Sequence, residues 1–105
     1  PLFEKYCKKH KIELTIREMS SLNPQAVSQA DLLFIDTVHK PAWLGKELML
    51  HQSHVGKYIV MHDTVTNGGN LHEVAKALTV LNKRWEMMEY CTLNVGYTVL
   101  KRISI

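Results

Sequence analysis

The sequence predicts an α/β fold in which helices cover a mostly parallel sheet that carries an antiparallel edge strand. Two short and continuous apolar runs, 31–36 and 57–62, are typical of strands buried on both faces. A helical apolar pattern separates these runs and predicts a strand–helix–strand unit. Two further strand patterns near the C-terminus are joined by a short turn, which predicts an antiparallel hairpin.

The N-terminal part of the chain predicts a helix, a strand and a loop. Residues 2–11 place apolar side chains on one side and lysines on the other, which is the pattern of an amphipathic helix. Residues 12–19 alternate between apolar and polar side chains and predict a strand. A loop follows at 20–23, and residues 24–30 are compatible with a short helix.

The central strand–helix–strand unit comprises strands at 31–36 (DLLFID) and 57–62 (KYIVMH). Pro41 suits the first turn of the intervening helix, and Gly56 suits the position just past its end. Because neither strand alternates, we expect both strands to lie inside the sheet, with helices on its two faces.

The C-terminal part predicts a helix followed by the hairpin. Residues 67–70 (NGGN) form a loop by composition. Apolar residues then recur at helical spacing from Leu71 to about Trp85. Strand patterns at 86–93 and 97–103 complete the chain, and the short break between them suits a hairpin turn.

Composition restricts the class of protein further. The 105 residues predict a single α/β domain spanning 1–105, and the net charge of +3 is too mild to indicate a nucleic-acid partner. No apolar run exceeds four residues, so we expect no membrane-spanning segment. Cys7 and Cys91 form no C-x-x-C pair, which favours reduced thiols and a cytoplasmic location.

Two features of the sequence concern its extent. It begins at Pro1 rather than at methionine, so we expect a trimmed chain or a piece of a longer one. Neither G-x-G-x-x-G nor G-x-x-x-x-G-K-[ST] occurs in it, so we expect no nucleotide-binding glycine loop within these residues.

Polar side chains follow the two central strands at the point where each strand ends. Asp36 and His39 come after the first strand, and His62, Asp63 and Thr64 come at the end of the second. Ligands bind at the carboxyl ends of parallel strands, and neighbouring strands lie about 4.8 Å apart, so Asp36 and Asp63 can converge on one ion. Such an oxygen-rich pair suits Mg²⁺ or Ca²⁺, although each aspartate could instead cap a helix or close a turn.

Histidines offer further candidates. His39 could act as a general base, because the unperturbed pKa of histidine lies near neutrality, or it could only orient a neighbour or lie in a loop. His51 and His54 have a spacing that can bind zinc, but no third ligand lies near them in the sequence. Their position near a helix C-terminus is explained by the helix dipole.

The stretch ADLLFIDTVHKPAWLGKELMLHQSHVGKYIVMHDTVTNGG resembles class I S-adenosylmethionine-dependent methyltransferases. The nearest branch is the one grouped with cephalosporin hydroxylase-like and rhamnosyl O-methyltransferase-like proteins. The shared pattern is an apolar strand ending in F-I-D-x-x-H, a helix carrying E-L and a strand ending in H-D-T. The tail NKRWEMMEYCTLNVGYTVLKRI resembles the closing antiparallel strand pair.

The resemblance implies a Rossmann-like, seven-stranded sheet, of which this chain supplies roughly strands three to seven. The missing front of the sheet would hold the glycine-rich cofactor loop. Carboxylates at the positions of Asp36 and Asp63 bind Mg²⁺ in related metal-dependent enzymes, and Thr64 stands where a third ligand is often Asn. His39 matches the position of a catalytic base.

Ser20 and Ser21 follow the third strand, where the loop of this family lies against the adenine of S-adenosylmethionine. The implied activity is methyl transfer to a hydroxyl group of a sugar, a phenol or another small molecule. The alternative is a non-catalytic α/β remnant or interaction module, which would form homo-oligomers or bind a partner through an exposed strand edge.

Overall fold

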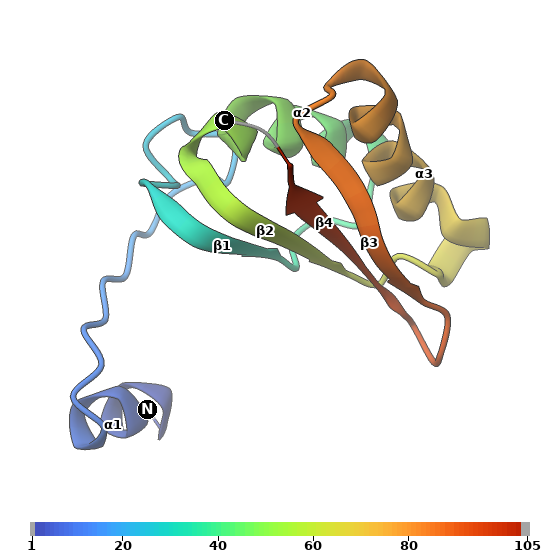
Figure 1. Cartoon of the computed structure of the whole chain (residues 1–105). Coiled ribbons are helices and arrows are strands. Elements are labelled where there is room, and N and C mark those ends of the chain that lie inside the picture. The colour runs from blue at the N-terminus through green and yellow to red at the C-terminus, as the bar shows by residue number, and fades with distance from the viewer. Residues whose placement is uncertain (1, 104–105) are drawn as a thin grey trace.

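The computed structural model describes residues 2–103, which form three α-helices and a four-stranded sheet (Figure 1). The elements follow in the order α1 (Leu2–Lys9), β1 (Ala30–Ile35), α2 (Pro41–His51), the 3-10 helix η1 (Gln52–His54), β2 (Val55–His62), α3 (Thr66–Leu81), β3 (Trp85–Cys91) and β4 (Tyr97–Arg102).

The sheet has the strand order β1-β2-β4-β3. Strands β1 and β2 are parallel, with Leu33 opposite Ile59. The other two pairings, β2 with β4 and β3 with β4, are antiparallel. The predicted hairpin is therefore confirmed. Since β4 is antiparallel to both of its neighbours, β1, β2 and β3 run in one direction and β4 runs in the other, so the described sheet is mixed. The prediction that the antiparallel strand lies at the edge is wrong. The last strand returns through the hairpin turn and enters between β2 and β3, so that β3 rather than β4 lies at the edge.

Helices α2 and α3 lie side by side behind the sheet in the view of Figure 1 and cover one of its faces. Their apolar residues pack against alternate residues of the strands. The buried core comprises Leu44 and Leu48 of α2, Leu71, Ala75 and Leu78 of α3, and Ile35, Val55, Ile59, Met61, Trp85 and Leu100 of the strands.

The opposite face of β1 is open among the described residues. Leu32 is 52% exposed and Phe34 is 55% exposed, whereas Ile35 is buried. The expectation that 31–36 and 57–62 would be covered on two faces is therefore wrong for these residues. β1 lies at the edge of the sheet, and the helices that follow β1 and β2 pack on the same side of it.

The N-terminal part of the chain stands apart from the sheet (Figure 1). α1 confirms the predicted helix, but residues 12–19 form no strand and residues 24–30 form no helix. The alternating segment runs extended with Ile12, Leu14 and Ile16 exposed. A strand needs a neighbour to complete its backbone hydrogen bonds, and no described strand pairs with this segment.

The ends of the helices differ in part from their predicted positions. Helix α2 begins at Pro41 as expected, but it ends at His51, and Gly56 lies inside β2. Helix α3 includes the predicted loop as a kink at 67–69, where the φ angles are 53°, 71° and 78°. It ends at Leu81 rather than near Trp85, which begins β3.

Among residues 2–103, no helix combines the length and the apolar character that crossing a membrane requires. Cys7 is buried, Cys91 is half-buried, and both are free thiols as predicted.

Candidate functional site

Four ionisable side chains meet where β1 and β2 end, and we call Asp36, His39, His62 and Asp63 the Asp/His cluster. Nε2 of His39 lies 2.7 Å from Oδ2 of Asp63 and 3.6 Å from Oδ1 of Asp36. Nδ1 of His62 lies 3.1 Å from the same oxygen of Asp63 and 3.5 Å from that of Asp36. The parallel pairing of β1 and β2 thus brings Asp36, His39 and Asp63 together as predicted, and it adds His62.

The four side chains differ in their access to solvent. Those of Asp36, His39 and His62 are 41–48% exposed, whereas that of Asp63 is only 12% exposed. Asp63 is therefore the buried member against which the two imidazoles are placed. A small molecule can reach the cluster from the side of the exposed residues.

The backbone of Asp63 is held in an uncommon conformation. Its φ angle is +61°, in the left-handed region that aspartate and asparagine tolerate better than most residues. Its N–H donates to the carbonyl of Gly96 at 3.0 Å, and the N–H of Val65 donates to the carbonyl of Val95 at 3.0 Å. The hydroxyl of Thr66 donates to the carbonyl of Asp63 at 2.9 Å. The β3–β4 turn thus fixes the main chain that carries the Asp63 carboxylate.

Thr64 uses its hydroxyl away from the cluster. The side chain is fully buried, and its Oγ1 accepts a hydrogen bond from Oγ1 of Thr98 at 2.9 Å. Thr98 in turn lies 2.9 Å from Nδ1 of His72. The role of Thr64 as a metal ligand stays a prediction. In this structure the Thr64 hydroxyl is instead part of a buried hydrogen-bond network with Thr98 and His72.

The protonation of His72 makes the free energy of unfolding depend on pH. Burial lowers the pKa of His72, the carboxylate of Glu73 opposes this shift, and Lys76 adds to it. The unfolded chain, in which the pKa is about 6.5, therefore binds the proton more readily than the folded chain does. The stabilising contribution is present above about pH 6.5 and is lost as the pH falls below it.

We therefore expect acidification from about pH 8 to about pH 5 to lower the melting temperature more in the wild type than in His72→Asn. Asparagine keeps a hydrogen-bond donor at this position and does not titrate. Circular dichroism melts at a series of pH values measure the difference. Parallel curves for the two proteins would contradict the assignment.

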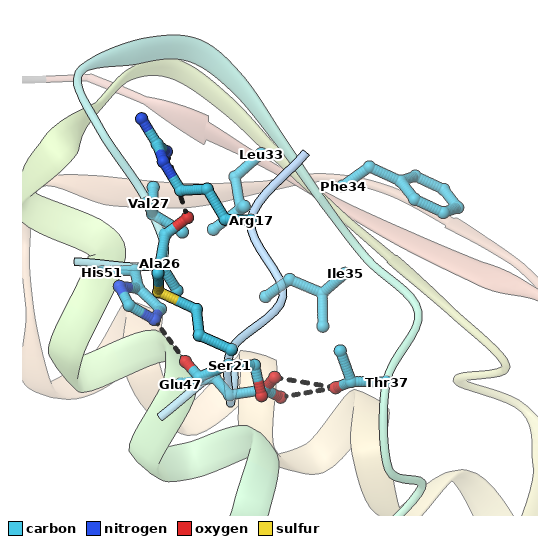
Figure 2. A pocket seen from close by; sticks show the side chains of 11 residues that line it. Arg17, Ser21, Ala26, Val27, Leu33, Phe34, Ile35, Thr37, Glu47 and His51 are labelled. Atoms are coloured by element: carbon cyan, nitrogen blue, oxygen red, sulfur yellow. Dashed lines mark hydrogen bonds between the residues drawn. The ribbon is translucent and has the colours of Figure 1, made fainter. Parts of the chain in front are cut away.

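Ser20 and Ser21 lie in the turn that precedes β1. The hydroxyl of Ser20 accepts a hydrogen bond from the N–H of Leu22 at 3.1 Å. Ser21 lines a cavity of about 210 Å³ (Figure 2). Ser20 is not one of the residues that line this cavity. The hydroxyl of Ser21 accepts from Nε1 of Trp43 at 3.0 Å, and its carbonyl accepts from Nε2 of His51 at 2.6 Å.

The cavity beside Ser21 is walled by apolar side chains and by two buried polar ones. Glu47 and His51 of α2 are each 2% exposed. Both carboxylate oxygens of Glu47 accept from the hydroxyl of Thr37, at 2.9 Å and 2.7 Å, as Figure 2 shows. Nδ1 of His51 has no hydrogen-bond partner among the described residues. Glu47 was not among the residues predicted from the sequence, although its spacing from Leu44 and His51 places it on the buried stripe of the helix.

No match to this chain was found among protein-family models, curated proteins or solved structures.

The Asp/His cluster has the donor chemistry of a divalent-cation site. Ligand atoms of Asp36, His39 and Asp63 all lie within 4.8 Å of one another. The four imidazole–carboxylate distances within the cluster span 2.7–3.6 Å. Neighbouring ligands of an octahedral ion bound at about 2.1 Å would be about 3.0 Å apart, so the spacing fits. Imidazole favours transition-metal ions and carboxylate suits Mn²⁺, so this mixed set suits Mn²⁺ as well as Mg²⁺.

Proposed function

We propose that this chain is the C-terminal part of a class I S-adenosylmethionine-dependent O-methyltransferase, which transfers a methyl group to a hydroxyl of a small molecule or a sugar. The observation that carries the proposal is the Asp/His cluster at the carboxyl ends of β1 and β2. All four of its members belong to the F-I-D-x-x-H and H-D-T motifs on which the resemblance to this family depends. The β1–α2–β2 unit, followed by a helix and an antiparallel strand pair, also agrees with the resemblance.

The open edge of β1 supports a larger sheet. β1 has the continuous apolar composition of an internal strand, yet it lies at the edge of the described sheet with Leu32 and Phe34 exposed. A further strand along β1, with a helix over the open face, would bury both side chains. In the proposed enzyme these additional elements carry the glycine-rich cofactor loop.

Each residue of the cluster has a separate role in activating the acceptor hydroxyl. Asp63 lies within 2.7 Å of Nε2 of His39, so Nδ1 of His39 is the atom that takes the hydroxyl proton. Asp63 then stabilises the positive charge that forms on the imidazole, as the carboxylate does in an Asp–His pair. Asp36 and Asp63 would hold a divalent cation together with the imidazole of His62 rather than that of His39, and when bound the cation would lower the pKa of the acceptor hydroxyl.

The cofactor in this proposal is S-adenosylmethionine, and Ser20 and Ser21 are the residues that would contact its adenine. The cavity beside Ser21 supports this placement, because its wall is mostly apolar and a few buried polar groups face it. The methyl group would have to lie in line between the sulfonium and the deprotonated hydroxyl.

Asp63→Asn is expected to weaken Mn²⁺ binding by about tenfold or more, since the variant loses the charge of the most buried ligand. Asparagine also tolerates the left-handed φ angle of this position, so the fold should persist. Isothermal titration calorimetry with Mn²⁺ and with Mg²⁺ measures the loss. The matched control is Asp31→Asn. Asp31 is exposed at the second position of β1, and its Oδ2 lies 3.9 Å from Nζ of Lys57. Equal affinities of the two variants would contradict a metal site at the cluster.

Titration with S-adenosylmethionine, with and without Mn²⁺ or Mg²⁺, tests the methyltransferase proposal itself. The experiment compares this chain with a chain extended at its N-terminus from the same gene. Binding by the extended chain supports the proposal. Absence of binding in both chains contradicts it and favours the alternative of a non-catalytic module, which the open edge of β1 would suit.

A further inference from the structure

A chain of three polar side chains runs through the interior from α3 to the residue after Asp63. Oγ1 of Thr98 donates to Oγ1 of Thr64 at 2.9 Å, and both threonines are 0% exposed. Nδ1 of His72 lies 2.9 Å from the same Thr98 oxygen. Because the single hydroxyl proton of Thr98 goes to Thr64, its oxygen accepts from His72, so Nδ1 of His72 carries a proton.

This row of hydrogen-bonded side chains fixes the position of the backbone rather than adding to the buried apolar surface. A buried hydroxyl must be hydrogen-bonded to offset its loss of water, and valine would fill nearly the same space without that requirement. Unlike valine, the two hydrogen-bonded hydroxyls provide a fixed connection between β4 and the residue that follows β2. Thr98 stands opposite Met61 in the β2–β4 pairing, and Met61 is two residues before Asp63 in the sequence.

The outer end of the chain is also held in place. The ring of His72 stacks on that of Tyr90, with the centroids 3.5 Å apart and the planes 7° from parallel. This contact joins α3 to β3 and limits rotation of the imidazole. The charged neighbours of His72 are Glu73 and Lys76 on its own helix.

The inner end of the chain lies beside the backbone that needs support. Asp63 has a φ angle of +61°, and such conformations persist only where the surroundings hold them. Hydrogen bonds to Gly96 and Val95 hold the main chain on either side of residue 64. The buried side chain of Thr64 is a further tether, and it faces the interior while the Asp63 carboxylate faces His39.

We propose that His72, Thr98 and Thr64 are positioning residues, which hold Asp63 with its carboxylate directed toward His39 and toward the proposed cation position beside Asp36. The inference rests on the proposed function in one respect, namely that the Asp/His cluster binds a divalent cation. In this proposal none of the three residues touches the cation or the substrate, so it replaces the ligand role that the resemblance implies for Thr64.

The test measures Mn²⁺ affinity by calorimetry in Thr98→Val, His72→Leu and His72→Asn. We expect about a tenfold loss in Thr98→Val and in His72→Leu, as is typical when an outer partner of a metal ligand is removed. His72→Asn should restore the affinity, because its amide places an N–H donor near the position of Nδ1. Thr92→Val, at an exposed threonine in the β3–β4 connection, is the control and should bind as the wild type does.

The second readout needs no cation. The ring ¹⁵N chemical shifts of His39 report its contact with Asp63, and they should change in Thr98→Val and His72→Leu and return in His72→Asn. Wild-type affinity together with unchanged His39 shifts in Thr98→Val would overturn the positioning role and leave the metal site standing. Failure of the wild type to bind Mn²⁺ would instead contradict the proposed function, and the His39 shifts would then decide the positioning role alone. Should His72→Leu fail to fold, Thr98→Val decides the outcome.

Discussion

Replacing Gly96 with alanine is expected to destabilise the folded chain by about 3 kcal/mol, because two costs add at this position. The φ angle of Gly96 is +74°, where a residue with a Cβ atom loses about 1–2 kcal/mol. The added Cβ would also meet Cγ2 of Val65 and lie 2.6 Å from the carbonyl oxygen of Cys91. Overpacking of this kind costs about 1–3 kcal/mol.

Gly68→Ala is the matched control for this prediction. The φ angle of Gly68 is +71°, and a Cβ there would meet no atom within 4 Å. Only the conformational cost of about 1–2 kcal/mol applies to it, and urea denaturation separates the two variants. Gly96→Ala should also weaken Mn²⁺ binding. The carbonyl of Gly96 accepts a hydrogen bond from the N–H of Asp63, so a shift of residue 96 would displace the Asp63 carboxylate. Equal losses of stability in the two variants would contradict the close approach of Gly96 to Val65.

Trp85→Ala is expected to cost about 3–5 kcal/mol, a large part of the total stability of a small domain. Trp85 begins β3 and is 2% exposed in the core. Its Nε1 donates to Oε1 of Gln52 at 3.0 Å, and the guanidinium of Arg102 lies 5.6 Å from its ring centroid. Alanine removes the packing, the hydrogen bond and the cation–π contact together.

Two comparisons define this second experiment. Trp85→Phe keeps most of the apolar packing and loses the hydrogen bond to Gln52, so its cost should be about 1–3 kcal/mol. Trp43→Ala removes a half-buried indole and should cost less than Trp85→Ala. Chemical denaturation provides all three values. A loss in Trp43→Ala as large as that in Trp85→Ala would contradict the central place of Trp85 in the core.

The parts of the fold that were predicted correctly from the sequence depend on interactions between residues that are close in sequence. The β1–α2–β2 unit, the start of α2 at Pro41 and the β3–β4 hairpin follow from local periodicity and turn residues. The meeting of Asp36, His39 and Asp63 also follows, because adjacent parallel strands end at the same edge of a sheet. Their chemical roles remain proposals that the metal titration tests.

Other features depend on contacts between residues that are distant in the chain. The alternation of residues 12–19 predicted a strand, but strand formation needs a partner edge that periodicity does not reveal. The apolar run of β1 predicted a covered strand, whereas its coverage depends on which elements pack on each face. In the same way, Glu47 is buried because its helix packs with that stripe inward.

Local pattern therefore determined which segments of this protein form the strand–helix–strand unit and the hairpin, and which polar residues follow the strands. Only the tertiary structure decided that β4 enters beside β2, that His62 joins the cluster, and that Thr64 turns inward to Thr98 and His72. The physical reason is that hydrogen-bond and packing partners in a sheet are chosen across the strands, whereas periodicity reports only the environment that each residue prefers.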